Sequence, residues 1–320
     1  MKLKSLFRKL GWYEPSADYT YLPDQYHIEV LNGWTNEAEK LWYHSFVKHH
    51  FRNKLTRQKS MLIASVFGPK KLIKKSQSLI KLFYTGENVE RYKDYKDHCS
   101  DLVDVMVGFD YKDDSAYQRF PYWLEFLFRP EVNAGMIREQ WTNLVNKHIC
   151  PDENKKFTSL VSSHDDGKIR TILFNGLSQI DRVDSGGKYL NNTSSLKDDF
   201  NNNKGNFIGH YKFNICPENS NREGYVTEKV FEALRSNTIP IYWGSNNNPE
   251  PDVLNKDAIL FYDGPESLPA LMKQVDELHT NPKLYLEFLN QPKFKPDAAE
   301  YIIHQFESLH SKIASAIHAN

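Results

Sequence analysis

The chain has 320 residues, with 41 Lys and Arg against 41 Asp and Glu, and 40% of its residues are hydrophobic. This length is enough for two domains of ordinary size, each with its own core, and the composition is that of a soluble globular enzyme. The formal net charge of zero gives no indication of nucleic acid as a partner, and no apolar run approaches the roughly 18 residues of a membrane span.

The ends and the cysteines predict a cytoplasmic protein. Cys99, Cys150 and Cys216 lack C-x-x-C spacing, which favours reduced thiols over a disulfide framework. The first residues, MKLKSLFRKLGWY, are basic but contain no apolar segment of the kind found in a secretory signal. We expect this segment to be solvated. The alternative is a peripheral contact with an anionic membrane surface, which would place the protein at the inner face of a membrane.

The first half of the chain predicts a Rossmann-like domain. Its elements are expected at residues 26–31 (strand), 36–51 (helix), 60–67 (strand) and 82–85 (strand). A basic cluster lies between the last two strands and consists of Lys70, Lys71, Lys74 and Lys75. Because apolar residues interrupt this cluster, it predicts the exposed face of a helix, and a phosphate-rich partner is the less favoured alternative.

A carboxylate follows the strand at 82–85. The apolar residues Phe83 and Tyr84 give way to Thr85 and Gly86 and then to Glu87. The carboxyl ends of parallel strands form the edge at which open α/β sheets bind ligands, and a carboxylate held there is able to serve as a general base. The alternative is a helix cap or a surface turn.

A domain boundary is expected where polar residues and Pro151 interrupt the pattern, which gives domains of residues 1–150 and 151–320. The second domain is expected to contain a strand at 157–162, a helix at 169–177, a strand at 257–261, and amphipathic helices at 284–289 and 298–317. The last helix is long enough to return to the first domain. Residues 191–205 are rich in Asn, Ser and Lys and predict a mobile excursion.

The most informative stretch runs from Lys212 to Gly244. It predicts a strand at 212–216, a polar loop, a helix whose first turn Thr227 is placed to cap, and a second strand at 239–243. Pro240 indicates that the second strand begins irregularly or lies at a sheet edge. Strand, helix and strand over so few residues form a βαβ unit, and hence part of a parallel sheet.

The loop of this unit predicts a ligand with two kinds of group. Unpaired N–H groups and the helix dipole favour an anion where the first strand leads into the helix, and Lys229 adds a positive charge there. Glu218 and Glu228 suit a ligand that also carries hydroxyl groups, because carboxylates accept hydrogen bonds from a diol. A nucleotide sugar has both. A solvated polar loop explains the spacing equally well.

The same residues carry a family resemblance. Glu218-Asn219-Ser220, then Tyr-Val-Thr-Glu-Lys at 225–229 and Ile-Pro-Ile-Tyr-Trp-Gly at 239–244, resemble the donor-binding signature of the α-1,3/4-fucosyltransferases of glycosyltransferase family 10. Tyr-Thr-Gly-Glu-Asn at 84–88 and Arg-Phe-Pro-Tyr at 119–122 are similar to its N-terminal motifs. Pro217 departs from the pattern, since the family usually has an aromatic residue there. Animal members have a Golgi anchor, and this chain, which lacks one, resembles a bacterial or viral form.

The resemblance implies an α/β fold of the GT-B type, in which two Rossmann-like domains face each other across a cleft. It implies an inverting α-1,3-fucosyltransferase that moves fucose from GDP-β-L-fucose to O3 of GlcNAc in a LacNAc-type acceptor. The catalytic base of the family falls on Glu87. Six residues are implied as donor-binding: Arg170, Glu218, Asn219, Tyr225, Glu228 and Lys229. Tyr117, Tyr122 and Trp123 offer stacking surfaces for an acceptor, and a packed aromatic cluster explains them equally well.

The sequence also bears on metals and cofactors. It contains no Asp-x-Asp triplet and no His or Cys cluster with metal-ligand spacing. We therefore expect no essential metal and no tightly bound cofactor, with Lys229, Arg170 and a helix N-terminus neutralising the leaving group. Two rival functions stay open: a transferase of the same fold with another nucleotide-sugar donor, and a non-catalytic homologue that binds nucleotides or carbohydrates.

Overall fold

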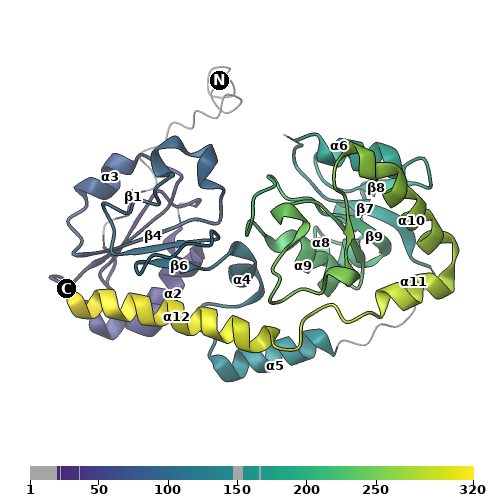
Figure 1. The fold of residues 1–320 in the computed structure, drawn as a ribbon. Helices are drawn as coiled ribbons and strands as arrows, with labels where there is room; N and C mark the ends of the chain where they lie inside the picture. Colours follow the sequence, from purple (N-terminus) through teal and green to yellow (C-terminus); the bar gives the residue numbers. More distant parts are fainter. Residues whose placement is uncertain (1–19, 22, 36, 147–153, 166) are drawn as a thin grey trace, which may run out of the picture. The chain divides into compact units, whose positions relative to one another are not determined.

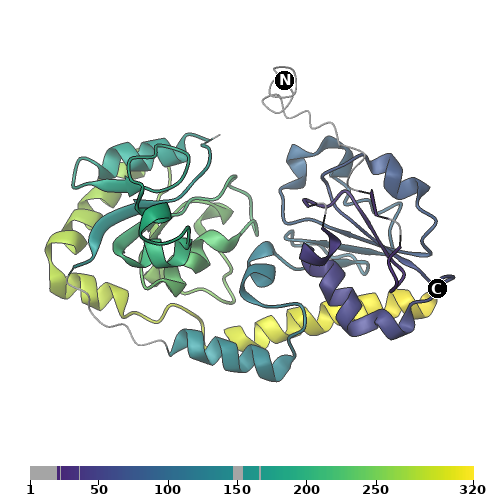
Figure 2. The ribbon, with the colours of Figure 1, turned by 180° about the vertical axis from the view of Figure 1, so that it is seen from behind.

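The structure is a computed structural model, and it describes residues 20–21, 23–35, 37–146, 154–165 and 167–320. Residue contacts divide the chain into two compact units: a first unit of residues up to 134 together with 302–320, and a second unit of residues 135–301. The boundary expected at 150 and 151, Cys150 and the basic N-terminal segment lie outside the described residues. Both units combine a sheet with helices (Figures 1 and 2).

The first unit contains a six-stranded sheet of order β1-β2-β3-β4-β5-β6. Its strands are β1 (Thr20–Tyr21), β2 (Ile28–Leu31), β3 (Met61–Ala64), β4 (Ile80–Tyr84), β5 (Val105–Gly108) and β6 (Tyr117–Arg119). All neighbours pair in parallel except β1 and β2. The structure confirms the three predicted strands, although each is shorter than expected or slightly shifted, and it adds the short strands β1, β5 and β6.

Helices complete this unit. They are η2 (Ala38–Lys40), α2 (Trp42–Phe51), η3 (Arg52–Lys54), α3 (Lys70–Lys75), η4 (Val89–Arg91), η5 (Lys93–Tyr95), α4 (Tyr122–Leu127) and the part of α12 (Ala298–Ala319) from residue 302 on. Phe306 of α12 packs with its ring centroid 5.0 Å from Phe120 and 5.9 Å from Trp42. Tyr117 and Trp123 are buried, which favours the packed cluster for these two, whereas Tyr122 is exposed.

The second unit contains a five-stranded, wholly parallel sheet of order β11-β10-β9-β7-β8. Its strands are β7 (Lys156–Leu160), β8 (Val183–Ser185), β9 (Tyr211–Ile215), β10 (Ile239–Tyr242) and β11 (Leu260–Phe261). Its helices are α5 (Ala134–Val145), α6 (Ile169–Leu177), α7 (Ser195–Asp198), α8 (Lys204–Gly209), α9 (Glu228–Arg235), η6 (Ser245–Asn247), η7 (Lys256–Ala258), η8 (Pro265–Ser267), α10 (Leu268–Thr280) and α11 (Pro282–Leu289). The predicted βαβ unit, β9-α9-β10, is confirmed.

The hydrophobic pattern explains how this sheet is covered. Phe213 and Ile215 of β9 are buried in one core with Leu173 of α6, Val275 of α10 and Tyr285 of α11. The helices α8 and α9 lie together on the other side (Figure 1). The apolar residues of α9 recur at helical spacing and are buried, whereas the polar residues at its start point toward the carboxyl edge of the sheet.

Two predictions about this unit need correction. Of the two alternatives for Pro240, the sheet edge is excluded because β10 lies between β9 and β11, whereas an irregular start fits, because pairing with β11 begins only at Ile241. Residues 191–205 are not a loose excursion, because they contain α7 and the start of α8. Phe207 and Ile208, just beyond that polar stretch, are fully buried and fix it to the unit.

One carboxyl of the first unit, that of the partly exposed Glu125, lies beside two tyrosines. Glu125 of α4 faces the hydroxyl group of Tyr43 on α2, and the ring of Tyr43 lies 4.4 Å from that of Tyr84 at the end of β4. Burial raises the pKa of Glu125 to about 8, and the hydrogen bond with Tyr43 offsets this only in part. Glu125 is therefore mostly protonated at neutral pH.

We predict that this carboxyl makes stability depend on pH. The folded state holds the proton more tightly than the unfolded chain. The contribution of Glu125 to the free energy of unfolding is therefore complete below pH 4.5 and is lost as the pH rises through about 8. Glu125→Gln should remove this part of the fall in the free energy of unfolding with rising pH. Urea unfolding between pH 5 and pH 9 measures it, with the exposed Glu131→Gln as the control. If the free energy of unfolding changed with pH in the same way in Glu125→Gln and the wild type, Glu125 would not be the group responsible.

Candidate functional site

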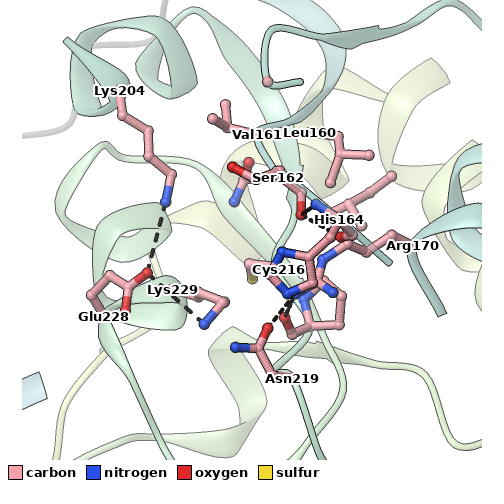
Figure 3. A pocket seen from close by; sticks show the side chains of 15 residues that line it. Leu160, Val161, Ser162, His164, Arg170, Lys204, Cys216, Asn219, Glu228 and Lys229 are labelled. Carbon is pink, nitrogen blue, oxygen red and sulfur yellow. Dashed lines mark hydrogen bonds and ion pairs between the residues drawn. The ribbon is translucent and has the colours of Figure 1, made fainter. Parts of the chain in front are cut away.

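A pocket of about 360 Å³ lies at the carboxyl edge of the second unit's sheet, where β7 and β9 end (Figure 3). Its lining comes from the ends of β7, β8 and β9 and from the starts of α6, α8 and α9. Four of the predicted donor-binding residues line it: Arg170, Asn219, Glu228 and Lys229. The structure thus brings these four together at the edge where parallel sheets bind ligands.

Glu218 lies behind the wall of this pocket. Its side chain is fully buried, and its carboxylate accepts hydrogen bonds from the backbone N–H of Thr227 (2.8 Å), the hydroxyl of Thr227 (2.7 Å) and Nζ of Lys229 (3.0 Å). Glu218 therefore ties the end of β9 to the start of α9 and orients Lys229. The sequence places it among the donor contacts, whereas its carboxylate here serves the protein's own groups.

Thr227 has a different task from the one predicted. It occupies the N-cap position of α9, as expected, but its hydroxyl donates to Glu218 and accepts from Nζ of Lys229 at 2.7 Å. The prediction that its side chain caps the first turn is therefore wrong. The physical reason is that the hydroxyl is held by two charged groups, donating to Glu218 and accepting from Lys229, and hydrogen bonds with charged groups are stronger than one from a backbone N–H.

Gly244 makes room for Glu218. Its φ of 141° lies in the region that favours glycine, and a Cβ at this position would lie 2.8 Å from the Cβ and Cγ of Glu218. The backbone N–H of Glu218 donates to the carbonyl oxygen of Trp243 at 2.8 Å. The close approach of the Glu218 side chain thus explains why the Ile-Pro-Ile-Tyr-Trp-Gly segment ends in glycine.

The charges around Lys229 alternate in sign. Nζ of Lys229 lies 3.9 Å from Oε1 of Glu228 and 3.0 Å from Oε2 of Glu218. Burial disfavours the ammonium ion, but Glu218 and Glu228 outweigh burial and raise the pKa of Lys229. Burial likewise disfavours the carboxylate of Glu228, but Lys229 and Lys204 outweigh it and lower its pKa. Both groups are therefore charged at neutral pH.

Arg170 forms another part of the pocket wall. Its Nη2 donates to Oδ1 of Asn219 at 2.9 Å and to the carbonyl oxygen of Pro217 at 3.2 Å. Pro217 retains the carbonyl group that this contact needs, so a proline is compatible with this wall of the pocket. The guanidinium group is almost completely buried but still lines the pocket, so its charge is fixed in place.

Asp165, which belongs to none of the sequence motifs, holds the start of α6. Its carboxylate accepts hydrogen bonds from the backbone N–H groups of Arg170 (3.2 Å) and Thr171 (2.8 Å). It is therefore the acceptor that caps α6 and positions Arg170. An aspartate shortly before a periodic apolar segment is a helix-start signal and could have identified it.

Tyr225, Gly187 and Lys204 differ in their relation to the pocket. Tyr225 is buried in the core, 2% exposed, and is not among the residues that line the pocket. Gly187, which follows β8, lines the pocket. Lys204, which sequence reasoning missed, lines it from the start of α8.

Glu87 belongs to the first unit. It follows β4, as predicted, and is half-buried at the carboxyl edge of that sheet. Its backbone N–H donates to Oγ1 of Thr85 at 3.0 Å, and Asn88 caps the short helix η4 that follows. Gly86 packs closely on Tyr122, since a Cβ there would lie 3.1 Å from the Cβ of that residue. The turn that presents Glu87 is thus well defined.

Within the described residues, no group of three or more His, Cys, Asp or Glu side chains is arranged to hold a metal ion. The described part of the chain also contains no helix with the length and apolar character needed to cross a membrane. Cys99 and Cys216 are buried free thiols, as predicted for these two.

Comparison with known proteins places both units in one family. Residues 149–313 match the glycosyltransferase family 10 (fucosyltransferase) C-terminal domain, and residues 27–126 match the α-(1,3)-fucosyltransferase FucT N-terminal domain. The α-(1,3)-fucosyltransferase FucT of Helicobacter pylori is 27% identical over 301 residues, which cover 83% of this chain and 60% of that protein. GDP-fucose protein O-fucosyltransferase 3 of Xenopus laevis is 29% identical over 230 residues, 68% of this chain and 46% of that protein. The chain thus spans about half to three fifths of the length of these relatives.

Solved structures agree with this match. A crystal structure of α1,3-fucosyltransferase superposes with a TM-score of 0.62 at 23% identity, covering 95% of this chain and 97% of the other. One of α1,3-fucosyltransferase with GDP-fucose gives a TM-score of 0.52 at 25% identity, covering 78% and 77%. These likenesses confirm the predicted α/β fold of the GT-B type. Because the match to the C-terminal domain of this family covers more than half of the sequence, the chain belongs to glycosyltransferase family 10, the fucosyltransferases.

Proposed function

We propose that this chain is an α-1,3-fucosyltransferase that uses GDP-β-L-fucose as its donor. The observation that carries the proposal is the pocket at the start of α9, where the fixed cations Lys229 and Arg170 lie beside Asn219 and Glu228. Cations match a diphosphate, and an amide and a carboxylate match the hydroxyl groups of ribose or fucose. A similar chain that has been solved with GDP-fucose supports this choice of donor.

The proposed reaction is a single displacement with inversion. The carboxylate of Glu87 takes the proton from an acceptor hydroxyl while that oxygen attacks the anomeric carbon of fucose from the face opposite GDP. The bond from the anomeric carbon to the diphosphate oxygen breaks, and GDP leaves with the bonding electrons. Lys229 and Arg170 neutralise the charge that develops on the leaving oxygen, and we propose that this step requires no metal.

The proposed acceptor is a GlcNAc unit in a LacNAc-type glycan, and O3 of this unit is the attacking oxygen. Relatives act on different acceptors, since one group is described as protein O-fucosyltransferases and another as α-(1,3)-fucosyltransferases. A screen of GDP-fucose against LacNAc, lacto-N-biose, chitobiose and a peptide substrate distinguishes these acceptor classes. Titration with GDP, UDP and CDP separates the proposal from a transferase with another donor.

Removal of the ammonium group of Lys229 should weaken nucleotide binding. A charge-assisted contact to a diphosphate contributes about 1.5–3 kcal/mol, so Lys229→Ala should raise the Kd for GDP roughly 10- to 100-fold. Isothermal titration calorimetry measures this, and Lys273→Ala removes a lysine that is 78% exposed on α10 as the control. Because the substitution leaves Glu218 buried without its cation, a melting curve should accompany it. An unchanged Kd for GDP in folded Lys229→Ala would contradict the role.

Substitution of Glu87 should separate turnover from donor binding. Loss of a general base typically costs 10²–10⁴-fold in rate, so Glu87→Gln should lower kcat by about that factor. The Kd for GDP should stay unchanged, because Glu87 belongs to the first unit and the donor pocket to the second. The exposed neighbour Glu90→Gln serves as the control. Normal turnover in Glu87→Gln would rule out Glu87 as the base.

A further inference from the structure

Lys204 is a cation of the pocket to which neither the motifs nor the proposed reaction gives a task. It is the first residue of α8, and Asn203 caps that helix by accepting from the backbone N–H of Asn206 at 3.0 Å. Figure 3 shows its side chain reaching toward Glu228, while Arg170 lies on the other side of the pocket. Its side chain is 30% exposed, so the ammonium group is partly shielded from solvent.

The ammonium group lies between two carboxylates. Nζ of Lys204 forms an ion pair with Oε2 of Glu232 and lies 4.0 Å from Oε1 of Glu228. Glu228 and Glu232 are four residues apart on α9 and so share one face of that helix, where like charges repel. Lys204, which comes from a different helix, is placed to offset this repulsion.

Both lysines act on Glu228, Lys229 more strongly than Lys204. The charged and titratable groups that face this pair of carboxylates are Lys204 on α8, Lys229 on α9 and the thiol of Cys216 after β9. Burial raises the pKa of Glu232, whereas the two lysines lower that of Glu228 despite its burial. Lys229 lies between Glu218 and Glu228, whereas Lys204 lies between Glu228 and Glu232 and is therefore the cation that the two carboxylates of α9 share through ion pairs.

We propose that Lys204 is a positioning residue of the donor site, which holds the Glu228 carboxylate in place to accept hydrogen bonds from hydroxyl groups of the donor. This inference rests on the proposed function, because it takes the donor to be a nucleotide sugar. Without Lys204, Glu232 repels Glu228 across one helical turn. The Glu228 side chain then turns away from α9, and its carboxylate binds a proton more readily.

The test compares three variants in donor kinetics at saturating acceptor. Lys204→Met should raise the KM for GDP-fucose roughly tenfold with little change in kcat, because it disturbs a binding contact and leaves the reacting groups in place. The acid limb of kcat/KM for the donor should move to higher pH. Lys204→Arg keeps the charge, so its KM for GDP-fucose and its acid limb should both match those of the wild type. Lys197→Met removes an exposed lysine of α7, in the same segment, and should behave as the wild type.

The outcomes separate this inference from the proposed function. A wild-type KM and acid limb in Lys204→Met overturn the inference while fucose transfer continues. Equal losses in Lys204→Arg and Lys204→Met also overturn it, because they indicate a steric role in α8 and not a charge effect. If Lys204→Met does not fold, Lys204→Gln takes its place, with the same expected shifts. Absence of fucose transfer by the wild type instead overturns the proposed function, and with it the premise of this inference.

Discussion

The pocket of the second unit depends on one buried carboxylate. Removing a carboxylate from water is costly unless its oxygens are paired, and Glu218 is paired with both donors of Thr227 and with the ammonium of Lys229. These contacts join the end of β9 to the start of α9. Gly244 leaves room for Glu218, because a Cβ atom at this position would collide with the Glu218 side chain. As a result Lys229 is held in one place before any ligand arrives, so its charge is available without reorganisation.

The rest of the pocket repeats this arrangement on the neighbouring elements. Asp165 fixes the start of α6 and therefore the position of Arg170, whose guanidinium contacts Asn219 and the carbonyl of Pro217. Lys204 at the start of α8 contributes the cation beside Glu228. Each cation is thus paired with an acid or an amide on a different element. The parallel sheet brings these helix starts to one edge, which explains why residues distant in sequence form one site.

The sequence predicts the parts of this site that depend on local pattern. The change from a short apolar run to helical spacing locates β9, α9 and β10, and the motif residues Arg170, Asn219, Glu228 and Lys229 do line one pocket. It does not predict that Glu218 lies behind that pocket or that Tyr225 is buried in the core, because side-chain direction depends on tertiary packing. Lys204 was missed because its polar neighbours predict a loop, and the burial of Phe207 that fixes α8 is not visible in that composition.

We expect a nucleotide diphosphate to bind where Glu218 holds Lys229. A crystal structure of the chain with GDP would test this binding site. We predict diphosphate oxygens within hydrogen-bonding distance of Nζ of Lys229 and the guanidinium of Arg170, with the ion pair between Lys229 and Glu218 intact. A diphosphate bound away from the start of α9, or bound there only after Lys229 has left Glu218, would contradict it.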